Sequence, residues 1–157
     1  MVGVDGILGV YRQVLPSLGF SGPTNFAPIL TECLKSVKYA TDQGIFAYST
    51  LLILTDGMIT DMNETIDALI DASALPISVI IIGIGNADFS SMDQLDSDKG
   101  LLRSRRNPTK FAQRDIVQFV PFNQFNGNLA ALSSAVLREL PNQVGKYFGM
   151  KGVPTKK

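Results

Sequence analysis

Residues 51–57 read Leu51-Leu52-Ile53-Leu54-Thr55-Asp56-Gly57, a short run of apolar side chains that ends in a polar turn. Such a run is typical of a strand that is buried on both faces, as in a parallel sheet. A second run, from Ile77 to Ile84, is rich in β-branched residues and predicts another buried strand. A third strand is expected from Ile116 to Val120. The three runs predict the strands of an α/β fold.

Segments with helical periodicity precede the first strand. Apolar residues recur at helical spacing over residues 7–18 and again over residues 26–40. Asp5 is expected to cap the first of these helices. The turn-forming cluster Ser21-Gly22-Pro23-Thr24-Asn25 separates the two helices.

Two further helices follow the first and third strands. One is expected to begin at Asp61, where Asp61 and Glu64 resemble a capping box, and to end before Pro76. The last apolar stripe covers residues 129–148, and we expect it to break or kink at Pro141. The order of strands and helices predicts a doubly wound, mostly parallel α/β sheet. Because such sheets usually have five or six strands, we expect the first strands of this one to be missing from the chain.

Length and composition exclude several classes of protein. The 157 residues fit one domain, and 14 basic and 14 acidic side chains give a formal net charge of zero. That balance gives no general reason to expect nucleic acid or an anionic membrane as a partner. The single cysteine, Cys33, suits a reducing compartment, and its apolar neighbours predict a core residue rather than a nucleophile. Because the chain has no histidine, it cannot form a Ser-His-Asp triad, a Cys-His pair or a His-based zinc site.

The sequence shows no targeting signal. The start, Met1-Val2-Gly3-Val4-Asp5, lacks the basic and apolar regions of a signal peptide, and the longest apolar stretch is too short to span a bilayer. We therefore expect a cytoplasmic protein. We divide the chain into a domain over residues 1–150 and a short basic tail over residues 151–157, and we expect the whole to be a piece of a longer protein.

Two residues are candidates for metal binding. In open α/β sheets, ligands bind beyond the carboxyl ends of the strands. Asp56 stands at such an end, and Thr24 lies in the turn cluster that precedes a helix. A carboxylate and a hydroxyl are hard oxygen ligands that suit Mg²⁺, Mn²⁺ or Ca²⁺. The alternative for Asp56 is a turn residue that caps the next helix, and spacing alone leaves both interpretations open.

Longer segments resemble known families. Gly22-Pro23-Thr24-Asn25-Phe26-Ala27-Pro28-Ile29 and Leu54-Thr55-Asp56-Gly57 resemble the second and third metal-site segments of a von Willebrand factor A domain. Three other segments are similar to copines, and together the segments extend over nearly the whole chain: Leu75-Pro76-Ile77-Ser78-Val79-Ile80-Ile81-Ile82-Gly83-Ile84-Gly85-Asn86-Ala87-Asp88-Phe89, Arg114-Asp115-Ile116-Val117-Gln118-Phe119-Val120-Pro121-Phe122 and Leu140-Pro141-Asn142-Gln143-Val144. Copines carry two C2 domains followed by an A domain and bind phospholipid in a calcium-dependent way. The resemblance implies that this chain is the later part of that A domain.

The resemblance implies a non-enzymatic protein-interaction module. The family's metal-ion-dependent adhesion site draws on three segments, and the match places its threonine at Thr24 and its second-loop aspartate at Asp56. The first segment, Asp-x-Ser-x-Ser, is expected upstream of Met1. In the complete site one coordination position stays open for an acidic residue of an intracellular partner, so that the metal is adhesive rather than catalytic. With only two of its protein ligands, the site is expected to bind Mg²⁺ or Mn²⁺ weakly or not at all, with Ca²⁺ as a further candidate.

The resemblance also bears on partners. In the family, the first strand lies beside the strand that ends at Asp56, so its absence would leave residues 51–54 along an unpaired edge. Such an edge invites pairing with another chain, and we expect self-association or segment swapping. Contact with membrane phospholipid, and calcium-dependent recruitment to the plasma membrane, are expected only through C2 domains outside this sequence.

Other functions remain open from the sequence. Asp56 could be the acid of a metal-assisted phosphoryl transfer, although no glycine-rich phosphate loop accompanies it. A copine-related plant ubiquitin ligase has a similar A domain, but it needs a RING finger whose Cys and His ligands this chain lacks. The segment from Ser97 to Arg114 is rich in basic residues. We expect a solvated surface loop balanced by Asp93, Asp96 and Asp98, with binding of an acidic peptide, phosphate or lipid headgroups as the alternative.

Overall fold

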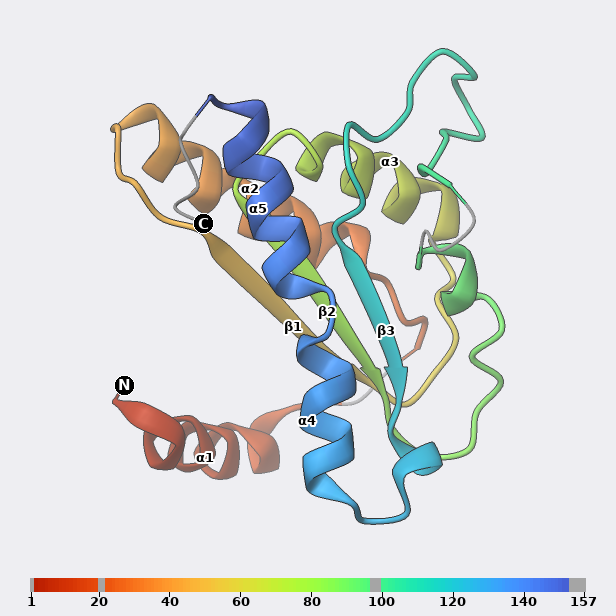
Figure 1. Ribbon diagram of the computed structural model, residues 1–157. Helices are drawn as coiled ribbons and strands as arrows, with labels where there is room; N and C mark the ends of the chain where they lie inside the picture. Colours follow the sequence, from red (N-terminus) through yellow and green to blue (C-terminus); the bar gives the residue numbers. More distant parts are fainter. Residues whose placement is uncertain (1, 20–21, 97–99, 153–157) are drawn as a thin grey trace.

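A three-stranded parallel sheet forms the centre of the protein (Figure 1). The computed structural model describes residues 2–19, 22–96 and 100–152. All three predicted strands are present, in the order β1 (Ser49–Thr55), β2 (Ile77–Gly83) and β3 (Val117–Pro121). Because the strands are parallel, their carboxyl ends meet at one edge of the sheet, which is where ligand sites form in such folds.

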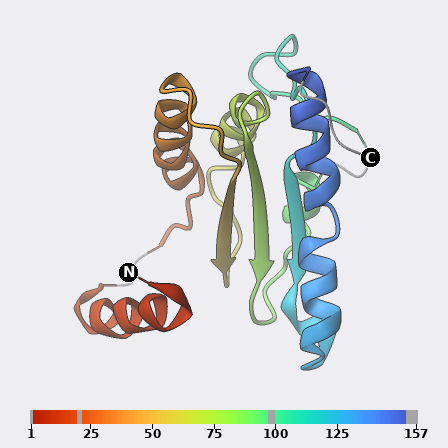
Figure 2. The same ribbon diagram turned by 60° about the vertical axis from the view of Figure 1, so that its left-hand side comes forward.

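Helices cover both faces of this sheet (Figure 2). One face carries α2 (Ala27–Asp42) and α3 (Met62–Ala72), and the other carries α4 (Leu129–Leu137) and α5 (Leu140–Met150). The predicted α/β class is confirmed, with three strands described where doubly wound sheets usually have five or six. In the part of the chain that the structure describes, no helix combines the length and the apolar character needed to cross a bilayer.

The main core lies between the sheet and the pair α2 and α3. Side chains alternate along a strand, so Ile53, Val79 and Ile81 point together toward these helices and are buried. Cys33 on α2 packs against the edge of this core as a filling residue, and burial raises the pKa of its thiol. The core also contains large side chains that are fully buried: Leu30, Leu69, Ile77, Met92, Leu95 and Ile116.

The opposite face of β1 is exposed, and the prediction that this strand is buried on both faces is wrong. Ile80 on β2 is covered by the helices on that side and is only 4% exposed. Its neighbours on β1, Leu52 and Leu54, are 54% and 60% exposed. The difference arises because α4 and α5 contact β3 and β2 and do not extend over β1.

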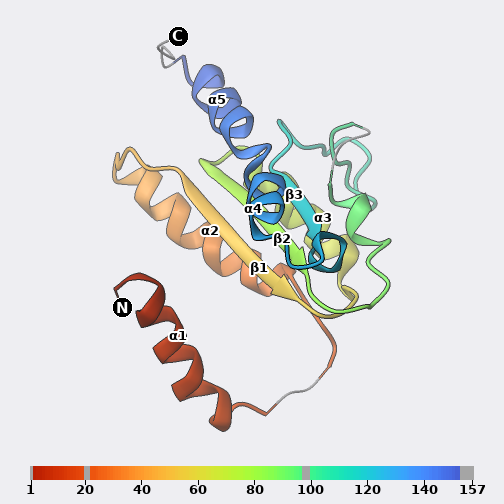
Figure 3. The same cartoon turned by 60° about the horizontal axis from the view of Figure 1, so that its bottom comes forward.

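The predicted first helix forms, but it buries none of its residues. α1 (Gly3–Val14) continues into the 3₁₀ helix η1 (Leu15–Ser17) and lies apart from the sheet (Figure 3). The cap prediction is wrong, because Val2 is the N-cap and Asp5 lies inside the first turn. The apolar stripe of this helix therefore faces solvent rather than a core.

The last helical stripe is interrupted, as predicted. α4 ends at Leu137 and α5 begins at Leu140, so Pro141 occupies the first turn of α5 rather than the interior of one long helix. Lys151 and Gly152 follow in a turn, and the rest of the predicted basic tail, residues 153–157, lies outside the described residues. The remaining short elements are η2 (Met92–Gln94) and η3 (Phe122–Phe125).

The segment after η2 is only partly the surface loop that we expected. Residues 97–99 lie outside the described residues, and an isolated antiparallel bridge joins Arg103 to Phe111. Among the described residues from Gly100 to Arg114, four side chains are buried: Leu102, Ser104, Ala112 and Arg114. The segment therefore contributes to the core between its exposed cations.

Two cations of this segment pair with carboxylates of α3. Arg106 pairs with Glu64 and lies 4.0 Å from Asp67, and Lys110 lies 2.7 Å from Asp71. Asp96 accepts the backbone N–H of Phe119 at 2.9 Å, and Asp98 is outside the described residues, so the predicted balance by these aspartates stays a prediction.

Candidate metal site

The loops that carry Thr24 and Asp56 meet at the carboxyl end of β1. Asp56 directly follows that strand and is exposed, whereas Thr24 is half-buried in the loop that leads into α2. The Thr24 hydroxyl lies close to the backbone of Gly57, the residue after Asp56. A Cβ placed on Gly57 would stand 3.4 Å from Thr24 Oγ1. The two predicted ligands thus belong to adjacent loops.

The carboxylate of Asp56 is free to accept a ligand. It has no hydrogen-bond or ion-pair partner among the residues that the structure describes. The alternative that Asp56 caps the next helix is therefore wrong, since α3 begins at Met62 and its N-cap is Asp61. An exposed carboxylate without a partner at a strand end is a group that a cation can reach.

Thr60 holds the Thr24 loop through the backbone carbonyl of Thr24. The Thr60 N–H donates to the Thr24 carbonyl at 3.0 Å, and the Thr60 hydroxyl donates to the same carbonyl at 3.0 Å. The hydroxyl also lies 2.7 Å from Asn25 Oδ1. The loop after β1 and the loop before α2 are thereby joined side by side.

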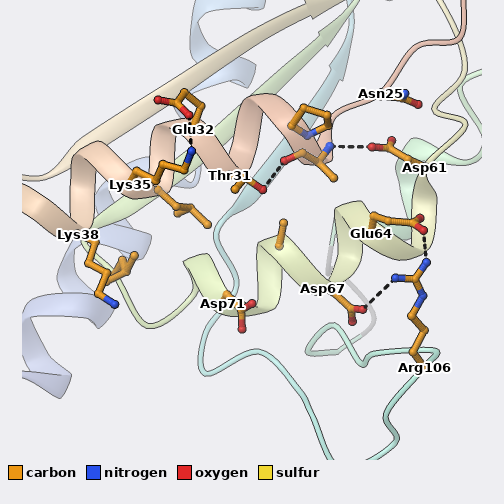
Figure 4. Close-up of a pocket in the computed structure, with 15 residues that line it drawn as sticks. Asn25, Thr31, Glu32, Lys35, Lys38, Asp61, Glu64, Asp67, Asp71 and Arg106 are labelled. Atoms are coloured by element: carbon orange, nitrogen blue, oxygen red, sulfur yellow. Dashed lines mark hydrogen bonds and ion pairs between the residues drawn. The ribbon is translucent and has the colours of Figure 1, made fainter.

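Asp61 reinforces this connection and was misassigned from the sequence. Its side chain makes no capping bond to its own helix. Instead, Oδ1 accepts the N–H of Phe26 at 3.0 Å and Oδ2 accepts the N–H of Ala27 at 2.9 Å, at the start of α2 (Figure 4). A carboxylate at a helix N-terminus satisfies unpaired N–H groups and interacts favourably with the helix dipole. The sequence signal available was a second acidic residue in the same loop as Asp56.

The donor chemistry fits a hard divalent cation but supplies few ligands. The hydroxyl of Thr24 and the carboxylate of Asp56 are oxygen donors of the kind that Mg²⁺ and Mn²⁺ accept. Within the described ranges, no group of three or more Cys, Asp or Glu side chains is gathered in a way that could hold a metal ion. An octahedral ion at these two residues would keep most of its positions filled by water.

A second polar cluster lies at the opposite end of the sheet and was not foreseen. Arg114 is 3% exposed, although the sequence predicts it within a solvated basic loop. Its Nη2 donates to the carbonyls of Leu75 and Ile77 at 2.6 and 2.7 Å, and its Nη1 donates to the Tyr48 hydroxyl at 3.0 Å and to the Gln143 carbonyl at 3.4 Å. A planar guanidinium suits this role because its donors point in several fixed directions.

Aromatic rings enclose this guanidinium. Arg114 lies 5.6 Å from the ring centroid of Tyr48 and 5.3 Å from that of Tyr147 on α5. Burial raises the pKa of the Tyr147 phenol, and the positive charge of Arg114 opposes that rise. Ser78 on β2 completes the cluster by donating to Gln143 Oε1 at 2.6 Å. The cluster fastens α5 to the amino-terminal end of the sheet, far from Asp56.

Comparison with known proteins agrees with the resemblance drawn from the sequence. The family model described as Copine matches residues 1–156. The chain is also 45% identical over 152 residues to Copine-C of Dictyostelium discoideum, and this match covers 97% of the chain and 28% of that protein. The chain thus spans less than a third of the length of this relative. The extent of both matches shows that the chain belongs to the copine family.

Proposed function

We propose that this chain is a non-enzymatic, cytoplasmic protein-interaction module whose Thr24 and Asp56 contribute to a divalent-cation site. The observation that supports the proposal is the open carboxylate of Asp56 on the loop beside the Thr24 hydroxyl. Mg²⁺ or Mn²⁺ fits these oxygen donors, and Ca²⁺ is the further candidate. A partner protein then offers an acidic residue to an open coordination position.

We assign the membrane role of the family to other domains of the full-length protein. Calcium-dependent phospholipid binding, and recruitment to the plasma membrane, belong to the C2 domains of a full-length copine rather than to these residues. The formal net charge of zero agrees with that division, since an anionic membrane gains no general attraction to this chain.

The phosphoryl-transfer alternative has no observation in its favour. It requires a second carboxylate beside Asp56, and the nearest candidate in the same loop, Asp61, is already engaged by two backbone N–H groups. A carboxylate held in that way serves the loop structure. The ubiquitin-ligase alternative likewise lacks the Cys and His ligands of a RING finger in this sequence.

Thr24→Ala and Asp56→Ala are expected to weaken Mn²⁺ binding in the full-length protein. Each removes one oxygen donor, and even residues that only orient metal ligands change affinity by roughly tenfold or more. Neither change should alter stability noticeably, because Asp56 is exposed with no protein partner among the described residues, and Thr24→Ala keeps the carbonyl through which Thr60 holds the loop. Isothermal titration calorimetry with MnCl₂ measures the affinity, and thermal unfolding measures the stability.

The matched control is Asp88→Ala, which removes another exposed carboxylate from the loops that follow the strands. The Asp88 side chain accepts the N–H of Ser90 at 2.9 Å, which lowers its pKa, and it is not a proposed ligand. This variant should bind Mn²⁺ as the wild type does. Equal affinity in the wild type and in all three variants would remove Thr24 and Asp56 from the site.

We also propose that this chain self-associates through the free edge of β1. In the described sheet, β1 pairs on one side only, with β2, and its outward-facing Leu52 and Leu54 are more than half exposed. A flat apolar edge strand is a template for pairing with a second chain. Light scattering over a concentration series should show a mass above that of the monomer.

Leu52→Glu combined with Leu54→Glu tests the role of this edge. Both positions are exposed, so the charges should leave the fold intact while they repel a second β1 and shift the protein to monomer. Leu137→Glu, at an exposed position at the end of α4, is the control and should leave the oligomeric state unchanged. A clean monomer for the wild type at working concentration would contradict the proposal.

A further inference from the structure

Helices α2 and α3 leave between them a groove of about 1220 Å³ (Figure 4). Asn25 and Asp61 line one end of it, next to the candidate metal site, and Lys38 lines the other. The volume is larger than the roughly 300–1,000 Å³ of pockets that enclose small ligands. A groove of this size along two helices suits a segment of polypeptide better than a small molecule.

The α2 wall of the groove carries two lysines and one glutamate, Glu32, and so has an excess of positive charge. Thr31, Lys35 and Lys38 follow one another at intervals of four and three residues, which places them on one face of the helix. Lys35 pairs with Glu32 of the same helix at 2.8 Å, and both side chains are exposed. Lys38 has no ion pair among the described residues. This wall can therefore accept an acidic side chain from outside.

The α3 wall is acidic. Glu64, Asp67 and Asp71 recur at intervals of three and four residues and line the same groove. Two basic side chains from the segment between η2 and β3 already lie on them, Arg106 on Glu64 and Asp67, and Lys110 on Asp71. These carboxylates thus form ion pairs with basic side chains from outside α3. Exposed ion pairs of this kind are weak, so a ligand can displace them.

The floor between the two walls is apolar. Leu34 on α2, Ala68 on α3 and Leu75 beyond it are partly buried and pack against the core. Ala27 and Pro28 continue the floor toward the metal-site end. Because two of these five residues are alanines, a ligand backbone can approach the floor closely. An apolar strip between charges of opposite sign is complementary to an amphipathic helix.

We propose that this groove binds an amphipathic helix of a partner protein. Its apolar face rests on the floor, its basic flank meets Glu64, Asp67 and Asp71, and its acidic flank meets Lys35 and Lys38. The acidic wall disfavours nucleic acid and anionic membrane. The exposed α1 of a second copy does not meet the requirement, because its twelve residues carry only Asp5 and Arg12 as charges. The surface is separate from the proposed cation ligands, so this inference does not depend on metal binding.

A set of synthetic helical peptides tests the proposal by fluorescence anisotropy. α3 has 11 residues and is about 16 Å long, so a labelled peptide of about 14 residues spans the groove. The probe carries a leucine stripe with lysines on one flank and glutamates on the other. The comparison peptides keep the stripe and carry glutamate on both flanks or lysine on both flanks. We expect the two-sign peptide to bind at least about tenfold more tightly than either of the others.

Protein variants locate the binding. Lys35→Glu with Lys38→Glu should lower the affinity for the two-sign peptide about tenfold, and Thr31→Trp should lower it similarly by filling the groove from an exposed position. The matched charge control is Lys146→Glu with Lys151→Glu on the far side of the sheet, at and just after α5, which should bind as the wild type does. Asp56→Ala should also bind normally, which separates this surface from the cation site.

Three outcomes would overturn the inference. The first is that no peptide binds the wild type at concentrations up to about 1 mM, where even weak specific complexes form. The second is that the peptides bind equally well whatever the charge of their flanks. The third is that the groove variants bind the two-sign peptide as tightly as the Lys146→Glu, Lys151→Glu control does.

Discussion

Replacement of Arg114 by methionine is expected to lower the free energy of unfolding by about 3 kcal/mol. The guanidinium is 3% exposed and makes hydrogen bonds to backbone carbonyls of Leu75, Ile77 and Gln143. Methionine fills much of the volume but donates nothing, so these carbonyls lose their charged partner and the contact with Tyr48 and Tyr147 is lost as well. Urea denaturation followed by circular dichroism measures the change.

Two further variants separate the charge of Arg114 from its shape. Arg114→Lys keeps a positive charge but cannot reach acceptors on opposite sides at once, so an intermediate loss of stability is expected. Arg105→Met removes an exposed arginine of the same segment and should change the unfolding free energy by less than about 0.5 kcal/mol. If Arg114→Met unfolds at the same urea concentration as Arg105→Met, the buried guanidinium does not fasten α5 to the sheet.

Asp61→Ala is expected to lower the free energy of unfolding by about 2 kcal/mol. Its carboxylate accepts the N–H groups of Phe26 and Ala27, and Oδ1 also accepts the Thr65 hydroxyl at 3.1 Å. Alanine leaves the first N–H groups of α2 without acceptors and removes the favourable charge at that helix end. Asp61→Asn keeps one side-chain acceptor, so a smaller loss is expected from the same denaturation experiment.

Asp56→Ala is the matched comparison for Asp61→Ala, since the two aspartates are five residues apart in the same loop. Asp56 has no described protein partner, and Asp61 makes three side-chain hydrogen bonds. The first variant should therefore affect cation binding and the second should affect stability. Equal stability of the two variants would show that Asp61 does not hold the start of α2.

The strands were predictable because burial in a parallel sheet leaves a continuous apolar run. β2 satisfies this rule along almost its whole length, with six of its seven residues buried. β1 has the same sequence pattern, yet Leu52 and Leu54 face solvent. An apolar run shows that a strand can be buried on both faces, but the covering of each face depends on helices elsewhere in the chain. The position of α1 away from the sheet could not be predicted for the same reason.

The candidate site was predictable only where its position follows from the fold. Asp56 ends a strand, and the strand-end rule together with the family resemblance placed it beside the Thr24 loop. Asp61 was missed because an acidic residue before a helix predicts a local cap, whereas its actual partners lie 34 and 35 residues earlier. Arg114 was missed because it closes a run of basic residues, and composition cannot distinguish one buried arginine from its exposed neighbours.

Protein contacts from two directions hold the Thr24 loop. Thr60 and Asp61 hold its backbone, and the side chain of Phe26, 2% exposed, anchors it in the core. If a cation binds at Thr24 as we propose, it meets a loop whose backbone is already held, so little chain entropy opposes binding. On that proposal, the number of donor atoms, rather than the cost of ordering the loop, sets the upper limit of the affinity.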